Sequence, residues 1–165
     1  MLDPTVILSD FPAPEDLVTG PDDEMLKTCV IIDDFDLSKL TKTQQVNVSK
    51  LFRYLSSHNN ISIMCSYQDF FSIPVIIRKC ATQFLIYKPR NIDELTVISK
   101  RVGIKRDEMH NIFNREMKTK RDCLLIDLTS PDEFMIRKNI FIPLNINDYK
   151  TIKYAKQKYT EKYEL

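Results

Sequence analysis

The chain has 165 residues, of which 43% are hydrophobic and 28% are charged. This length and composition predict one compact domain that buries a real core. The 24 basic and 23 acidic side chains leave a net charge of +1. Such a balance argues against the basic surface of an autonomous nucleic-acid binder, so we expect any DNA contact to be local.

Neither secretion nor membrane insertion is indicated. No stretch approaches the roughly 20 apolar residues of a membrane span, and aspartate stands near the N-terminus, where a signal peptide carries positive charge. We expect a soluble, intracellular protein without membrane contact.

The cysteines lie far apart, and three of them (29, 65 and 123) fall in apolar, strand-like runs, where a thiol behaves as a small hydrophobic side chain. Neither histidine has a second ligand at zinc-like spacing. We therefore expect reduced core thiols and no zinc site. The cysteines are Cys29, Cys65, Cys80 and Cys123.

Residues 1–26 contain seven acids, no base and four prolines, which indicates an acidic connector. The β-branched run at 28–33 then predicts a buried parallel strand that ends on acids. Apolar residues recur at helical spacing over 41–57, and 61–66 predicts a second strand.

The next elements are a helical turn at 74–78, begun by proline, and a third strand at 82–87. Asn91 is the predicted N-cap of a helix that ends at Gly103, with Glu94 completing a capping box. A second helix follows to about residue 117. Its predicted buried stripe consists of Met109, Ile112, Phe113 and Met117.

Residues 123–128 predict a fourth strand, and 134–141 predict a fifth strand that forms a hairpin with it. From residue 147 onward, tyrosines and isoleucine at helical spacing predict a basic amphipathic helix. This helix either docks on its own domain or contacts a neighbouring subunit or DNA phosphates. Its candidate contact residues are Lys150, Lys153, Lys158 and Lys162.

Two adjacent carboxylates follow the first strand. At the carboxyl end of a parallel strand, Asp33 is placed to hold the water shell of Mg²⁺, and Asp34 to orient or deprotonate an attacking water. Gln68 follows the second strand and would stand beside these acids if the two strands are neighbours. Arg78 is a candidate arginine finger or a surface ion-pair partner.

The segments CVIIDDFD, NISIMCSYQDFFSIPVIIRKC, FLIYKPRNIDEL and CLLIDLTSPDEFMIRKN stand in this order over residues 28–141. In order and spacing they resemble the distal part of genome-packaging ATPases of large DNA viruses, including the poxvirus type, within the FtsK-HerA group of P-loop NTPases. The resemblance implies an α/β fold: a partial RecA/ASCE-like core with a mainly parallel sheet in three αβα layers, a C-terminal β-hairpin and a terminal helix.

The family resemblance also implies a ring-forming motor that couples ATP hydrolysis to movement of duplex DNA into a preformed capsid, with Mg²⁺ and ATP as cofactors. It matches Asp33 to the Walker B acid that binds Mg²⁺ through water, and Asp34 to the catalytic carboxylate, usually glutamate in related motors. Gln68 matches the polar sensor. Arg78 matches an arginine that contacts nucleotide in the adjacent subunit.

The phosphate-binding loop of that family is missing, because neither Gly20 nor Gly103 begins a GxxxxGK[ST] pattern. In the family the strand before this loop lies between the sensor strand and the next strand, so its absence would leave two strand edges open. We expect the chain alone to hydrolyse ATP poorly or not at all. Expected partners are a homo-oligomeric ring or a loop-bearing subunit, duplex DNA, and a capsid portal or vertex in a virus factory or virion.

The resulting organisation is a connector (1–26), the distal half of an ATPase domain (27–144) and a terminal helix (145–165). A non-catalytic assembly or DNA-binding module derived from such an ATPase is the main alternative. A phosphoacceptor receiver domain fits poorly, because Asp127 lies 127 − 33 = 94 residues after Asp33, about twice the usual separation.

Overall fold

The computed structural model of the chain describes residues 13, 17, 28–34, 36, 39–56, 61–89 and 91–150. The chain divides into two compact units, Met1–Ala81 and Thr82–Leu165. The division falls inside the predicted ATPase domain of residues 27–144. Within the described residues the fold is mixed α/β, with a parallel two-stranded sheet and an antiparallel four-stranded sheet.

The first unit is built on a parallel pair of strands, as the β-branched runs predicted. Its elements are β1 (Thr28–Asp33), α1 (Lys42–Lys50), the π-helical turn η3 (Leu51–Leu55), β2 (Ile61–Ser66), the 3₁₀ turn η4 (Phe70–Ser72) and α3 (Val75–Cys80). Strands β1 and β2 pair in register from Thr28↔Ile61 to Asp33↔Ser66.

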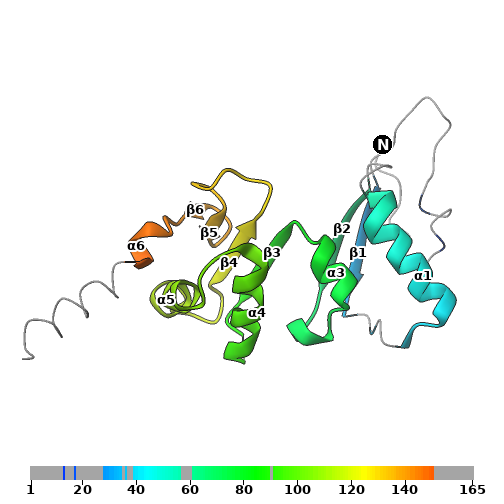
Figure 1. The fold of residues 1–165 in the computed structure, drawn as a ribbon, viewed down its shortest axis with the longest axis horizontal. Helices are drawn as coiled ribbons and strands as arrows, with labels where there is room; N and C mark the ends of the chain where they lie inside the picture. The colour runs from blue at the N-terminus through cyan, green and yellow to red at the C-terminus, as the bar shows by residue number, and fades with distance from the viewer. Residues whose placement is uncertain are drawn as a thin grey trace, which may run out of the picture. The chain divides into compact units, whose positions relative to one another are not determined.

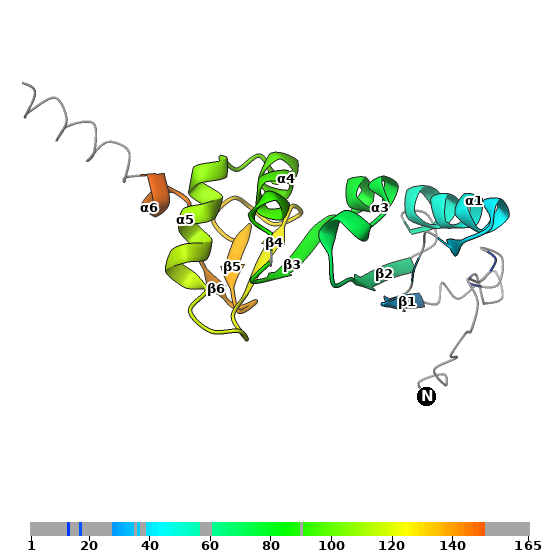
Figure 2. The same cartoon turned by 90° about the horizontal axis from the view of Figure 1, so that it is seen from below.

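Helices α1 and α3 lie on the same face of this pair (Figure 2). Thr41 begins α1 with a capping box to Gln44, a signal that our sequence analysis missed. The core between helices and strands contains Leu40, Val48 and Ile77. One face of the strand pair is therefore buried beneath helices.

The opposite face of the strand pair is exposed. Ile31 and Met64, which are register partners, are 68% and 63% exposed, and Cys29 beside them is exposed as well. The prediction of a core thiol is wrong at Cys29, because its side chain points to this open face. Parallel sheets are normally covered on both faces, so this apolar surface is unusual for a finished α/β layer.

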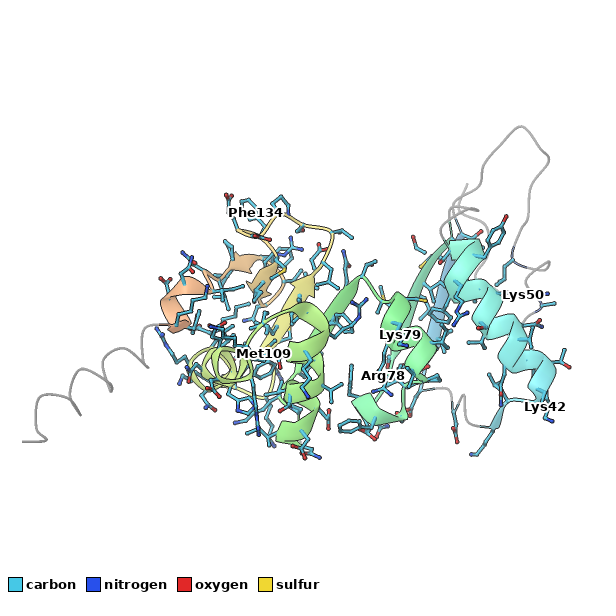
Figure 3. All side chains as sticks on the ribbon, in the orientation of Figure 1. Lys42, Lys50, Arg78, Lys79, Met109 and Phe134 are labelled. Carbon is cyan, nitrogen blue, oxygen red and sulfur yellow. The ribbon has the colours of Figure 1, made fainter. Side chains whose placement is uncertain are left out.

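The second unit packs two helices on an antiparallel sheet of order β3-β4-β5-β6 (Figure 1). Its elements are β3 (Gln83–Tyr87), α4 (Ile92–Val102), α5 (Arg106–Glu116), β4 (Cys123–Asp127), β5 (Ile136–Lys138), β6 (Ile142–Pro143) and α6 (Asn147–Lys150). The predicted stripe of α5 is confirmed, since Met109, labelled in Figure 3, and its three companions are all buried.

Helix α4 begins and ends where the sequence predicted. Asn91 accepts a hydrogen bond from the backbone N–H of Asp93 at 2.9 Å, so the cap is an Asx-type cap and not the expected capping box with Glu94. Gly103 takes a left-handed conformation (φ 75°) that terminates the helix.

Two predictions differ from the structure. The sheet is not mainly parallel, because two helices connect β3 to β4 and return the chain beside β3 in the opposite direction. The predicted fifth strand at 134–141 is shorter. Its pairing with β4 is confirmed, but the chain turns at Asn139 and Ile140, both at positive φ, and returns as β6.

Candidate functional site

The carboxyl ends of β1 and β2 bring their polar residues together. Because the strands are parallel and in register, Asp33 lies opposite Ser66. The Ser66 hydroxyl donates a hydrogen bond to Asp33 Oδ1 at 2.7 Å. Ser66 was not among the residues predicted for the site, although its position at the end of the second strand was a usable signal.

Asp34 continues this edge one residue further. Its N–H donates to the Ser66 carbonyl at 3.3 Å, and its backbone turns into the left-handed region at φ 47°. Aspartate tolerates that conformation better than most residues. Gln68 Nε2 donates to Asp34 Oδ2 at 3.0 Å, which confirms that Gln68 stands beside the acids. All four side chains at this edge are exposed.

The edge therefore presents two carboxylates, each held by one neutral donor. One oxygen of each carboxylate accepts a hydrogen bond, from Ser66 at Asp33 and from Gln68 at Asp34. Mg²⁺ usually keeps several waters and needs only one or two protein carboxylates when phosphates supply other ligands. The residues at this edge fit that role, whereas within the described ranges no three His, Cys, Asp or Glu side chains converge on a site that could enclose a metal ion.

Arg78 comes from α3, which begins after Pro74 (Figure 3). Its guanidinium lies over the Phe70 ring, 5.2 Å from the centroid. Phe70 opens the 3₁₀ turn that Asp69 caps through the Phe71 N–H at 2.9 Å. A contact of this kind attracts the guanidinium to the face of the ring. The structure thus links Arg78 to the segment that follows Gln68.

The start of the predicted terminal helix docks on its own unit. Tyr149 is buried, its hydroxyl donates to Glu116 at 2.8 Å, and Arg115 lies over its ring at 4.7 Å. Burial is the main cause that raises the pKa of Tyr149 to about 12. Lys150 donates to Asn147 Oδ1 at 3.0 Å. The other candidate contact residues, Lys153, Lys158 and Lys162, lie outside the described residues.

A second polar centre lies at the end of β4. Asp127 is buried, and its carboxylate accepts from the Thr129 hydroxyl at 2.6 Å and from the Ser130 hydroxyl and Arg137 at 2.8 Å. The hydrogen bond from Thr129 is the largest cause that holds the pKa of Asp127 well below its usual range. A carboxylate with both oxygens occupied is a structural anchor and not an open phosphoacceptor.

Comparison with protein-family models, with curated proteins and with solved structures finds no match to this chain. Among the helices of the described residues, none has the length and apolar character needed to span a membrane.

Proposed function

We propose that this chain forms the Walker B and sensor part of a motor ATPase that couples ATP hydrolysis to translocation of viral duplex DNA into capsids. The observation that carries the proposal is the pairing of Asp33 with Ser66 and of Asp34 with Gln68 at one strand edge. A parallel α/β sheet binds its ligands at this edge.

Within the proposed site the two aspartates have different tasks. Asp33, held by the Ser66 hydroxyl, would hold Mg²⁺ through water, and that ion would neutralise phosphate charge. Asp34 would orient or deprotonate the attacking water. Gln68 donates to Asp34 and can add a neutral hydrogen bond to the water or the γ-phosphate. Arg78 would contact nucleotide in a ring neighbour.

The open face and edge of the β1–β2 pair support a role that needs a further segment or subunit. Among the described residues β2 pairs with β1 alone, and the exposed Ile31 and Met64 lie on the uncovered face. A loop-bearing ATPase half in a RecA/ASCE-like, three-layer arrangement would cover both. The assembly would be a ring at a capsid portal or vertex, in a virus factory or virion.

A non-catalytic module that binds DNA or a partner is the second candidate. The observation in its favour is the positive charge of residues 41–81, the part of the chain that includes helices α1 and α3. These residues carry five bases and one acid, Asp69. Lys42, Lys50, Arg78 and Lys79 are labelled on α1 and α3 in Figure 3. Such a layer suits phosphate contacts that weaken with salt.

Equilibrium binding of Mg-ATP separates the two candidates. We expect weak binding that falls about tenfold or more in Asp33→Asn, because the amide can still accept from Ser66 but no longer carries charge. Asp36→Asn is the matched control, since Asp36 pairs with Lys39 outside the site. Binding that is indifferent to Asp33→Asn, together with salt-sensitive DNA retention, would favour the module.

A further inference from the structure

The second unit contains a cavity of about 570 Å³ that the proposed ATPase site does not use. It lies between the end of α4, the start of α5, the turn after β4 and the segment around α6. All of its lining residues belong to this one unit. Its volume falls within the range of small-ligand sites in proteins.

The cavity combines an apolar wall with acidic groups. Val102, Ile104, Met135 and Ile146 provide the apolar lining. Glu108, Asp132 and Glu133 provide three carboxylates, against the single ammonium of Lys150. The lining therefore carries a net charge of 1 − 3 = −2, and the Lys150 ammonium is already bonded to Asn147.

Glu108 is the buried residue among the three acids of the cavity, since Asp132 and Glu133 are exposed. It is only 8% exposed, yet no described residue donates a hydrogen bond to its carboxylate or forms an ion pair with it. Its carboxylate oxygens are not among the fully enclosed polar atoms of the described residues, so they keep contact with the space that Glu108 lines. Its place in the first turn of α5 gives a favourable helix-dipole interaction but no direct partner. The cavity is therefore the side from which a partner can reach this carboxylate.

The chemistry of that partner follows from the lining. Since the described part of the chain gathers no three acidic or imidazole ligands for a metal ion, a bare divalent cation fits poorly. An organic cation fits both features, because its alkyl stem can lie along Val102, Ile104 and Met135 while its charged end meets Glu108.

We propose that this cavity binds the guanidinium or ammonium end of an aliphatic chain, with Glu108 as its principal acceptor. The group is either an arginine or lysine side chain of a partner protein or a free alkyl amine. The cavity belongs to the second unit, whereas Asp33 and Asp34 belong to the first, and the proposal does not depend on nucleotide binding.

The test is a titration of the ¹⁵N-labelled full chain with butylguanidinium, followed by amide chemical shifts. The control ligand is butylurea, which has a similar shape but no charge. We expect shifts at the amides of Gly103, Ile104, Met135 and Asn147, a dissociation constant of roughly millimolar size, and no comparable response to butylurea.

Glu108→Gln should weaken butylguanidinium binding about tenfold or more, because it removes the negative charge while keeping the side-chain shape. Glu94→Gln, the same change on α4 outside the cavity, should leave binding unchanged. The melting temperature of Glu108→Gln should equal or exceed that of the wild type, since the Glu108 carboxylate has no described partner to lose. If Glu108→Gln does not fold, Glu133→Gln at the exposed rim is expected to weaken binding instead.

A peptide Gly-Arg-Gly with blocked ends separates the two sources of the ligand. Binding of both the peptide and butylguanidinium supports a partner's side chain, and binding of butylguanidinium alone supports a free amine. Equal responses to butylguanidinium and butylurea, or unchanged binding in the folded charge variants, would overturn the proposal.

Discussion

Asp127→Ala is expected to lower the free energy of unfolding of the second unit by about 3–5 kcal/mol. The substitution removes the acceptor of Thr129, Ser130 and Arg137 together, and it leaves Arg137, whose side chain is 25% exposed, without its ion-pair partner. Hydrogen exchange of the β3, β4 and β5 amides would measure this loss separately from the first unit.

The double variant Asp127→Ala/Arg137→Met provides the control for this prediction. Because it removes the partly buried guanidinium together with its partner, it should recover a large part of the lost stability. Asp93→Ala, at an exposed site on α4, should change stability by less than about 0.5 kcal/mol. If Asp127→Ala lowered the free energy of unfolding by less than about 0.5 kcal/mol, as expected for Asp93→Ala, the result would contradict the anchoring role of Asp127.

The same anchor gives the second unit a defined acid sensitivity. Because folding lowers the pKa of Asp127, the stabilisation is present above the unfolded pKa, near pH 4, and is lost as pH falls towards the folded value. Asp127→Asn should flatten this part of the stability curve. If Asp127→Asn lost stability below about pH 4 as steeply as the wild type, other carboxylates would control acid unfolding.

In the native assembly, Asp34→Asn is expected to reduce ATP turnover about 100-fold or more. Asparagine can keep the left-handed backbone at this position and still accept from Gln68, so the change removes the basic group and little else. Steady-state phosphate release by wild type and variant would measure the effect.

Two further results would bear on that prediction. Asp36→Asn should turn over ATP like the wild type, because Asp36 lies outside the paired edge. The purified chain by itself should show no turnover, because no phosphate-binding loop occurs in its sequence. Turnover by the purified chain that disappears in Asp34→Asn would contradict the requirement for a supplied loop.

Local signals predicted the elements well. Asn91 and Gly103 bound α4 as expected, and the apolar spacing of α5 identified residues that are now seen to be buried. The candidate site was also predictable, because two parallel strands ending in polar residues must bring those residues to one edge. The meeting of Gln68 with Asp34 required only that the strands be neighbours.

Longer-range features were not predictable from these patterns. The antiparallel pairing of β3 with β4 depends on how α4 and α5 return the chain. The turn after β5 includes Asn139, whose N–H donates to the Cys123 carbonyl and whose Oδ1 accepts from the Cys123 N–H. The next residue, the β-branched Ile140, stands at φ 72°, a conformation that local sequence patterns do not predict. The cavity at Glu108 arises only when four separate segments pack together.

The most direct test of the proposed nucleotide site is paramagnetic line broadening by Mn²⁺-ATP on the ¹⁵N-labelled chain. We predict broadening centred on the amides of Asp33, Asp34, Ser66 and Gln68, which disappears in Asp33→Asn and persists in Asp36→Asn. Broadening centred elsewhere, or broadening of this edge that persists in Asp33→Asn, would contradict the assignment of the β1–β2 edge as a metal-nucleotide site.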